Sequence, residues 1–498
     1  MTIKHLFLRI SCLGIAGGLL WFGAGGFWAD PYSPDSTVAA PFLTKVDQQG
    51  LIQLIEVYRP QIRDDWFSHL TAFGRAGVRI FLYRWIGEPS LGNQETAIIS
   101  QLHRLRFNPT QPYLITGAHY SDLYIRNLGI FYNELLNGDA ALSQDDWLNR
   151  QRIALQTVAL DLEFLHQEHH LVTTIVPLGG ESFTGINIYA EPSDALYGVL
   201  FELRELERSG MESEGTTRQL QAKYYEDLRA EVRRYLETVL DPQTHFIKKD
   251  IHLSSARDGV QRQSAFYDNV IAWKTVQLAQ RLNLMNRAEW AEQWQFLFDA
   301  SEWKQQILNA YWSDTVGYFK NGLQDDSFSA DSLIVFQTNF LDLNNQDDLK
   351  KAIMLLQTVH TQSSSRPFPL SYTLDNKSQN FQPMVGMFAR SYASSAIWSH
   401  WGIEYAKALI LLSQQLQSSE SCRFLDRAHQ TLTAYQKNMV QTGGYPELYA
   451  ADGSEFRQPV IKSVLHSGWV VNYEAAQAEF KIATQSSHCV FPDHLLQY

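Results

Sequence analysis

The sequence predicts an all-α fold in which pairs of helices repeat around an axis. Stretches with the apolar period of a helix cover most of the chain after residue 45, whereas strand-like runs are few and short. Breakers containing glycine or proline recur between these stretches. No short repeat with a fixed signature is present, so the pattern does not favour a regular solenoid.

The helical period is clear in FYDNVIAWKTVQLAQRLNL, where Ile271, Leu278 and Leu282 share one face and the polar residues lie off it. Comparable patterns predict helices at 46–57, 95–106, 121–136, 146–168, 193–208, 217–239, 264–283, 287–310, 330–341, 346–361, 391–418, 421–440 and 462–479. Strand-like runs lie at 78–85, 172–178 and 316–321. This number of helices fits an (α/α)6 toroid of helical hairpins whose long loops collect at one end. No linker within 46–498 is long enough to mark a second domain, so we predict one toroid there.

The N-terminus has the layout of a signal peptide or signal anchor, because basic residues precede a charge-free apolar run from Ile10 to Ala29. That run is just long enough to span a bilayer. No clean small-residue cleavage site follows it, which favours an uncleaved anchor. We therefore expect residues 1–29 to hold the protein at a membrane, residues 30–45 to form a tether, and the remainder to be exported, either periplasmic or extracellular.

Composition narrows the function. The chain has 498 residues, a net charge of −12 and no Lys/Arg-rich run, which argues against nucleic-acid binding. Its 13 Trp, 23 Tyr and 27 Phe either fill a core or line a carbohydrate cleft. We expect a monomer. Cys422 and Cys489 lie outside the anchor, and either a disulfide or two buried free thiols fits an exported chain.

Two segments carry candidate polar side chains near predicted helix starts. In HYSDLYIRNLGIFY, Arg126 beside Asn127 suits a clamp on vicinal sugar hydroxyls. A surface arginine next to a residue that caps the helix would give the same sequence pattern. In HLSSARDGVQRQSAFYDNVIAW, Asp258 precedes the helix, but Asp-Gly is also an ordinary turn. Asp268 falls inside the helical pattern and is expected to face a neighbouring hairpin.

A third segment, TGGYPELYAADGSEF, places Glu447 between Tyr445 and Tyr449 in a glycine-rich loop. The proline before Glu447 favours an extended backbone ahead of it, which would present the carboxylate to a cavity. Two further segments cluster aromatic and histidine side chains: IWSHWGIEYAKAL contains Trp398 and His400, and SVLHSGWVVNYEAA contains His466 and Trp469. Taken alone, each of these two segments is more often part of a core or a helix interface than of a functional site.

In this order the segments resemble the six-hairpin glycosidases, the (α/α)6 superfamily that includes trehalase, processing α-glucosidase I and the glucosidase domain of debranching enzymes. YIRN (124–127) resembles the Trp-x-Arg-Asp sugar-binding motif, and SARDG (255–259) the motif of the general acid. GGYPELYAADG (443–453) resembles the loop of the general base, while 397–409 and 468–469 resemble the starts of later hairpins.

The resemblance implies an inverting glycoside hydrolase acting on an α-linked glucoside or an envelope glycan, with Asp258 as general acid and Glu447 as general base. It implies no metal or other cofactor. The implied substrate-binding residues are Tyr124, Arg126, Asn127, Arg262, Trp398, Tyr445, Tyr449, His466 and Trp469.

The sequence departs from the motifs in ways that keep other functions open. Tyr124 and Asn127 replace a tryptophan and a carboxylate. Arg257 adjoins Asp258, and a close cation lowers the pKa of a carboxyl group, which is unfavourable for a general acid. The alternatives are a toroid that binds or assembles glycans without cleaving them, and a lyase or epimerase working through histidine and tyrosine.

Overall fold

The computed structural model describes most of the chain between residues 60 and 489. The described residues are 60–75, 87–107, 113–115, 122–125, 127–130, 144–179, 182–187, 191, 193–208, 213–251, 253, 262–362, 370, 373, 397–416, 419–450, 452–458, 462–486 and 489. The predicted anchor at 1–29, the tether at 30–45, the helix at 46–57 and the strand-like run at 78–85 lie outside them. No helix among the described residues has both the length and the apolarity that a bilayer crossing requires.

Helices dominate the described chain. Besides the helical residues 66–75, they are α4 (Glu95–Arg106), α5 (Asn127–Ile130), α6 (Gln144–Glu168), α7 (Ala195–Arg208), α8 (Ser213–Lys223), α9 (Tyr225–Val239), α10 (Phe266–Arg281), α11 (Ala300–Tyr311), α12 (Ile334–Gln337), α13 (Gln346–Gln362), α15 (Ser399–Gln415), α16 (Ser419–Thr442) and α17 (Val470–Ser486). Three 3-10 helices join them: η1 (Arg287–Glu289), η2 (Glu292–Phe298) and η3 (Ala330–Leu333).

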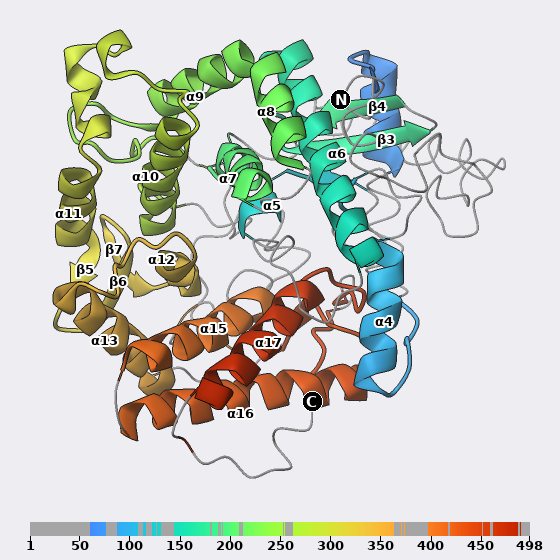
Figure 1. Cartoon of the computed structure of the whole chain (residues 1–498), viewed down its shortest axis with the longest axis vertical. Helices are drawn as coiled ribbons and strands as arrows, with labels where there is room; N and C mark the ends of the chain where they lie inside the picture. Colours follow the sequence, from blue (N-terminus) through green and yellow to red (C-terminus); the bar gives the residue numbers. More distant parts are fainter. Residues whose placement is uncertain are drawn as a thin grey trace, which may run out of the picture.

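The helices form a ring with an inner and an outer layer (Figure 1). Inner and outer helices alternate along the chain: α4 then α5, α6 then α7, α9 then α10, α11 then α12, α13 then α15, and α16 then α17. Successive inner helices contact one another from α5 through α7, α10, α12 with η3, and α15 to α17. This arrangement is the ring of helical hairpins that the sequence predicts.

The inner helix α10 shows why the sequence adopts this arrangement. Nearly all its residues are buried, because an inner helix has a neighbour on every side. It ends where Asn283 takes a left-handed conformation, with φ of 57°, and the amide of Leu284 donates to the carbonyl of Ala279 over 2.8 Å. A close approach of Gly129 to Gly198 lets α5 lie directly against α7, since a Cβ on Gly129 would lie 2.8 Å from the Gly198 Cα.

Several predicted helices are interrupted. The predicted helix 287–310 is wrong in its first half, which contains η1 and η2, and α11 begins only where Asp299 accepts a 3.0 Å hydrogen bond from the amide of Glu302. The predicted helix 330–341 is the short pair η3 and α12, stopped where Asn339 has φ of 53°. The predicted helix 217–239 is divided into α8 and α9 at Tyr224.

Within the described residues, three small sheets accompany the helices. The first has the order β1 (Gln61–Ile62), β4 (Ser182–Ile186), β3 (Thr174–Gly179) and β2 (Leu123–Tyr124), with β1 parallel to β4 and the other pairs antiparallel. The second joins β5 (Trp312–Ser313), β6 (Tyr318–Gly322) and β7 (Asp325–Phe328), and the third pairs β8 (Ile397–Trp398) with β9 (Leu448–Tyr449). The strand-like runs at 172–178 and 316–321 are thus confirmed as β3 and β6.

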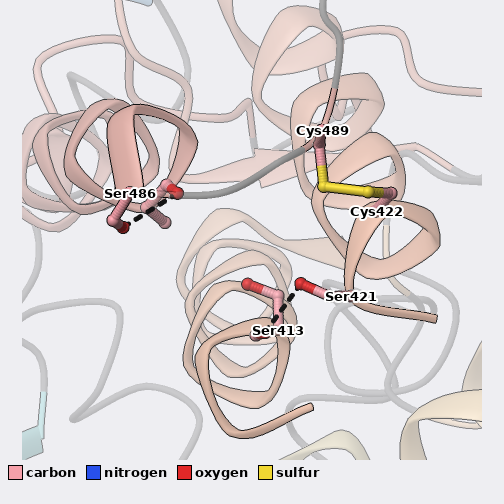
Figure 2. Close-up of a disulfide and its surroundings, with 6 residues drawn as sticks. Ser413, Ser421, Cys422, Ser486 and Cys489 are labelled. Atoms are coloured by element: carbon pink, nitrogen blue, oxygen red, sulfur yellow. Dashed lines mark hydrogen bonds between the residues drawn. A yellow bond between two sulfur atoms is a disulfide. The ribbon is translucent and has the colours of Figure 1, made fainter. Parts of the chain in front are cut away.

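A disulfide between Cys422 and Cys489 ties the first turns of α16 to the C-terminal segment, with 5.4 Å between the two Cα atoms (Figure 2). Close by, the hydroxyl of Ser421 donates to the carbonyl of Ser413 at the end of α15 over 2.8 Å. Of the two possibilities that the sequence leaves open, the structure therefore has the disulfide.

Candidate active site

The N-terminal ends of the inner helices converge at one end of the ring. Asp268 at the start of α10 hydrogen-bonds to Ser193, which lies just before α7. Arg262, before α10, binds Asp331 in η3 with 2.5 Å between Nη1 and Oδ2. Because helix N-termini favour negative charge, this end of the ring is suited to carboxylates and to electron-rich ligands.

Asp268 is a buried carboxyl group with a raised pKa. It is 4% exposed, and burial raises its pKa to about 6, although Arg262 and the hydrogen bond from Ser193 act in the opposite direction. Its Oδ1 has no hydrogen-bond partner within the described part of the chain. A carboxyl group in this state keeps its proton up to a higher pH than a free aspartate does, which suits a general acid.

The ion pair beside Asp268 supplies a fixed positive charge. Arg262 and Asp331 are both buried, with 6% and 2% of their side chains exposed, and Arg262 also donates to Asn321 over 3.2 Å. Burial lowers the pKa of Arg262, but the negative charges of Asp331 and Asp268 outweigh it, so the pKa is raised overall. Arg262, which the sequence predicted to bind substrate, is therefore paired with the carboxylate of Asp331.

A second carboxylate and two tyrosines complete this side. The hydroxyl of Tyr267 donates to Asp194 over 3.1 Å, and the hydroxyl of Tyr235 donates to the carbonyl of Ser193 over 2.7 Å. These bonds fix the short segment before α7 against α10 and α9. The ring of Tyr267 also packs edge to face on Trp401 of α15. This contact links the carboxylates near the start of α10 to the aromatic side chains at the start of α15.

Aromatic side chains from two hairpins gather at the start of α15. The rings of Trp398 and Trp469 lie 5.5 Å apart, and the ring of His400 lies 5.7 Å from Trp469. The structure thus brings together two predicted substrate-binding tryptophans that are far apart in the sequence. Burial lowers the pKa of His400 well below its usual range, so this imidazole is neutral at pH 7.

Glu447 is held against the start of α15 by backbone hydrogen bonds. Its carbonyl accepts from the amide of Ser399 over 3.1 Å, and its own amide donates to the carbonyl of Val464 over 2.9 Å. Immediately after it, β9 pairs with β8 and sets Leu448 opposite Trp398. Glu447, 7% exposed, therefore lies in the backbone framework that also positions the tryptophans.

The two tyrosines beside Glu447 are packed into the core. Tyr445 and Tyr449 are both fully buried, and both contact the ring of Tyr435 on α16. Tyr445 also meets Tyr473 of α17. These rings pack in the core and support the loop that carries Glu447. Their contact with a sugar stays a prediction.

His466 is held by the segment before α4. Its Nε2 lies 2.9 Å from the carbonyl oxygen of Pro89, and its Nδ1 lies 3.7 Å from the carboxylate of Glu88. The same carboxylate accepts from the amides of Leu465 and His466 over 2.6 and 2.7 Å. Arg106 donates to the carbonyl of Gly468 in the same loop. His466 is thus a component of the loop's framework.

The remaining predicted residues are divided between described and undescribed segments. Tyr124 is half-buried in β2 opposite Thr174, and Asn127 is buried as the first residue of α5. Arg126 and Asp258 lie outside the described residues, as does Arg257. The predicted pair of Asp258 and Glu447 therefore stays a prediction.

The described residues contain no group of three or more His, Cys, Asp or Glu side chains arranged to hold a metal ion. The acidic run at 325–331 is already engaged, because Asp325 accepts from Asn321 over 2.6 Å and Asp331 binds Arg262.

Asp268 is the main residue to which sequence reasoning gave too little weight. The sequence places Asp268 in the first turn of α10, but its burial comes from neighbouring hairpins that no local pattern reveals.

Solved structures similar to this chain include three bacterial carbohydrate-active enzymes. A rhamnosidase from Klebsiella oxytoca with rhamnose bound is 14% identical, with 80% of this chain and 66% of that chain covered and a TM-score of 0.46. A metal-independent α-mannosidase from Streptococcus pneumoniae is 10% identical, with 88% and 97% covered and a TM-score of 0.43. An unsaturated glucuronyl hydrolase from Bacillus sp. GL1 is 11% identical, with 71% and 85% covered and a TM-score of 0.38.

No family model and no curated protein matches the sequence. The structural similarities are distant in both sequence and geometry. The function proposed below is therefore built on the residues of this chain.

Proposed function

We propose that this chain is a glycoside hydrolase whose active site lies where the inner helices begin. The observation that carries the proposal is Asp268, a buried carboxyl group with a pKa raised to about 6 at the convergence of those helices. A carboxyl group with a pKa near 6, placed where the inner helices begin, suits proton donation to a glycosidic oxygen.

In the proposed mechanism Asp268 takes the role of general acid that the sequence resemblance implied for Asp258, and Glu447 keeps the implied role of general base. Asp268 protonates the leaving oxygen as the glycosidic bond breaks. Glu447 takes a proton from a water molecule, whose oxygen attacks the anomeric carbon from the opposite face and inverts its configuration. Trp398 and Trp469 offer ring faces on which the apolar face of a sugar can stack. Arg262 limits the rise in the Asp268 pKa, so the acid can lose its proton during turnover.

We further propose an α-linked glucoside or a related envelope glycan as substrate, in line with the order of the sequence motifs. An exported, membrane-attached and monomeric protein is part of the same proposal. The Cys422–Cys489 disulfide supports export, because such bonds persist in oxidising compartments.

The test is a hydrolysis screen of the purified protein on α-linked glucosides, mannosides and their oligosaccharides. Proton NMR of the first-formed sugar should show inversion at the anomeric carbon. Glu447→Gln should lose more than about 10³-fold in turnover, since in the proposed mechanism this carboxylate alone activates the water. The matched control is Glu302→Gln, an exposed glutamate on α11 that should leave turnover unchanged. Activity that survives in Glu447→Gln contradicts the assignment of the base, and a panel without any hydrolysis contradicts the proposed function.

A further inference from the structure

The helical residues 66–75 carry large apolar side chains on their outward face. Trp66, Phe67, Leu70 and Phe73 are 75%, 53%, 59% and 51% exposed. In Figure 1 this helix is the blue one beside β3 and β4. Together these four side chains, here called the apolar face, make up most of the large exposed apolar residues of the described chain.

The amphipathic pattern of this helix is inverted relative to an ordinary surface helix. Its inward face carries the small residues Ser68 and Ala72, which are buried, and Ala72 packs on Val176 of β3 and Ile186 of β4. A helix that only covered the sheet would bury its large apolar side chains and expose its small polar ones. Exposed apolar clusters of this kind mark surfaces that meet another apolar phase.

Hydrogen bonds at both Asp65 and Arg75 orient the apolar face relative to the sheet. At the start of the helix the Asp65 carboxylate accepts from the amides of Phe67 and Ser68 over 3.1 and 3.0 Å. Further along, Arg75 donates to the carbonyl of Leu178 in β3 over 2.7 Å. Trp66 and Phe67 meet edge to face, with ring centroids 6.0 Å apart.

We propose that the apolar face lies in the interfacial layer of a lipid bilayer and holds the ring against the membrane. The sequence argues for lipid as the partner, because the charge-free run at 10–29 precedes this helix by only 36 residues, from Ala29 at its end to Asp65 at the cap. Thirty-six residues reach at most about 120–130 Å when fully extended and less where the predicted helix 46–57 forms, so a bilayer reached by residues 10–29 is within reach of residue 66. Tryptophan and phenylalanine are also residues that partition into the membrane interface.

Local charge indicates that this docking depends on apolar burial rather than on anionic lipid. Arg63 is exposed just before the helix, but Asp64 and Asp65 are exposed beside it, and the chain as a whole carries a net charge of −12. Docking should therefore occur on zwitterionic phosphatidylcholine vesicles and change little with salt.

The test attaches an environment-sensitive fluorophore to the full chain at Leu70→Cys. The protein also carries Cys12→Ser and keeps the Cys422–Cys489 disulfide, so that only the new cysteine is labelled. The matched control is Ile482→Cys on α17, where the native side chain is also apolar and 63% exposed. In phosphatidylcholine vesicles, the label at 70 should be at least about five-fold less quenched by aqueous iodide than the label at 482, and should be quenched by a lipid-embedded quencher.

Two results would overturn the proposal. Equal iodide quenching at 70 and 482 would show that the apolar face stays in water. Shielding of the label at 70 from both quenchers would show that protein, either a second copy or another part of this chain, covers it. A second variant carries the label at Trp66→Cys together with three substitutions in the apolar face, Phe67→Ser, Leu70→Ser and Phe73→Ser. Its unfolding midpoint should match that of the parent protein, while the lipid quenching is lost; retained quenching would contradict the role of these side chains.

Discussion

Arg262 and Asp331 form a buried ion pair, with 2.5 Å between Nη1 and Oδ2, that joins the segment before α10 to η3. The pair has two effects. It fixes two neighbouring hairpins at the end of the ring where the inner helices begin. It also places a cation near Asp268, which keeps the pKa of that carboxyl group from rising further.

We predict that Arg262→Met destabilises the protein by about 3–5 kcal/mol, because Asp331 is then left buried without its cation. Where activity can be measured, the decline of kcat with rising pH should also move upward by about one unit, since the pKa of Asp268 rises. Urea unfolding and a pH–rate profile measure the two effects. The double variant Arg262→Met/Asp331→Asn should be more stable than Arg262→Met alone; equal or lower stability would show that the pair does not act as a unit.

Gly402 in α15 should not tolerate a side chain. A Cβ there would lie 1.8 Å from the hydroxyl oxygen of Tyr435, which itself donates to the carbonyl of Ser399 over 3.1 Å. Gly402→Ala should therefore cost about 1–3 kcal/mol in thermal or urea unfolding. Gly215→Ala in α8 is the matched control, because nothing lies within 4 Å of its Cβ position, and it should stabilise the helix by about 0.5–1 kcal/mol. Similar effects at both positions would refute the close packing of α15 on α16.

The disulfide should contribute measurably to stability. Cys422 and Cys489 are separated by 67 residues in sequence, so their link restricts the unfolded chain over a long loop. Cys422→Ser/Cys489→Ser should lower the free energy of unfolding by about 2–4 kcal/mol, and a reductant should have no effect on that variant. Cys12→Ser should leave unfolding unchanged. Two free thiols in the non-reduced native protein, counted by alkylation at these positions, would contradict the disulfide.

Glu88 should position the loop that supports Glu447. Its carboxylate accepts from the amides of Leu465 and His466, and the adjoining residue Val464 accepts from the amide of Glu447. Glu88→Gln keeps the size of the side chain but weakens two charge-assisted hydrogen bonds, so kcat should fall about ten-fold while KM changes little. Steady-state kinetics separate these constants, with Glu302→Gln as the control. An effect confined to KM would place Glu88 in substrate binding instead.

The sequence predicted the ring of hairpins because its inner helices are strongly apolar and regularly interrupted. The apolar period of α10 and the extents of α4, α6, α7, α13 and α16 follow from local pattern alone. Helix interruptions were harder to predict. The 3-10 segments before α11 depend on the packing of Trp290 and Trp294, which a local helical period cannot reveal.

In the candidate site, the sequence indicated the functional residue types more readily than the burial and contacts of each side chain. The proximity of Trp398 to Trp469 was expected only from the resemblance, and the packing of α15 against α17 now accounts for it physically. The raised pKa of Asp268 depends on burial from several hairpins at once, so no local motif could report it. Likewise, the complete burial of Tyr445 and Tyr449 follows from their contacts with Tyr435 on another helix.

The pH dependence of stability gives an independent check on Asp268. Its folded pKa of about 6 lies above the value near 4 in the unfolded chain, so the folded state binds the proton more tightly. The associated stability is present below pH 4, is lost as the pH rises from 4 to about 6, and is then absent at higher pH. Asp268→Asn should consequently be more stable than the native protein at pH 8, by up to about 3 kcal/mol, and show less pH dependence.

Asp268 is proposed to donate the proton in glycoside hydrolysis. The most direct measurement compares the turnover of Asp268→Asn with that of Asp258→Asn on the best substrate from the screen. The exposed Asp326→Asn in β7 serves as the matched control. We predict a loss of more than about 10²-fold for Asp268→Asn, with its fold intact, and near-native turnover for the other two variants. Near-native turnover in Asp268→Asn, with the loss appearing in Asp258→Asn, would contradict the account.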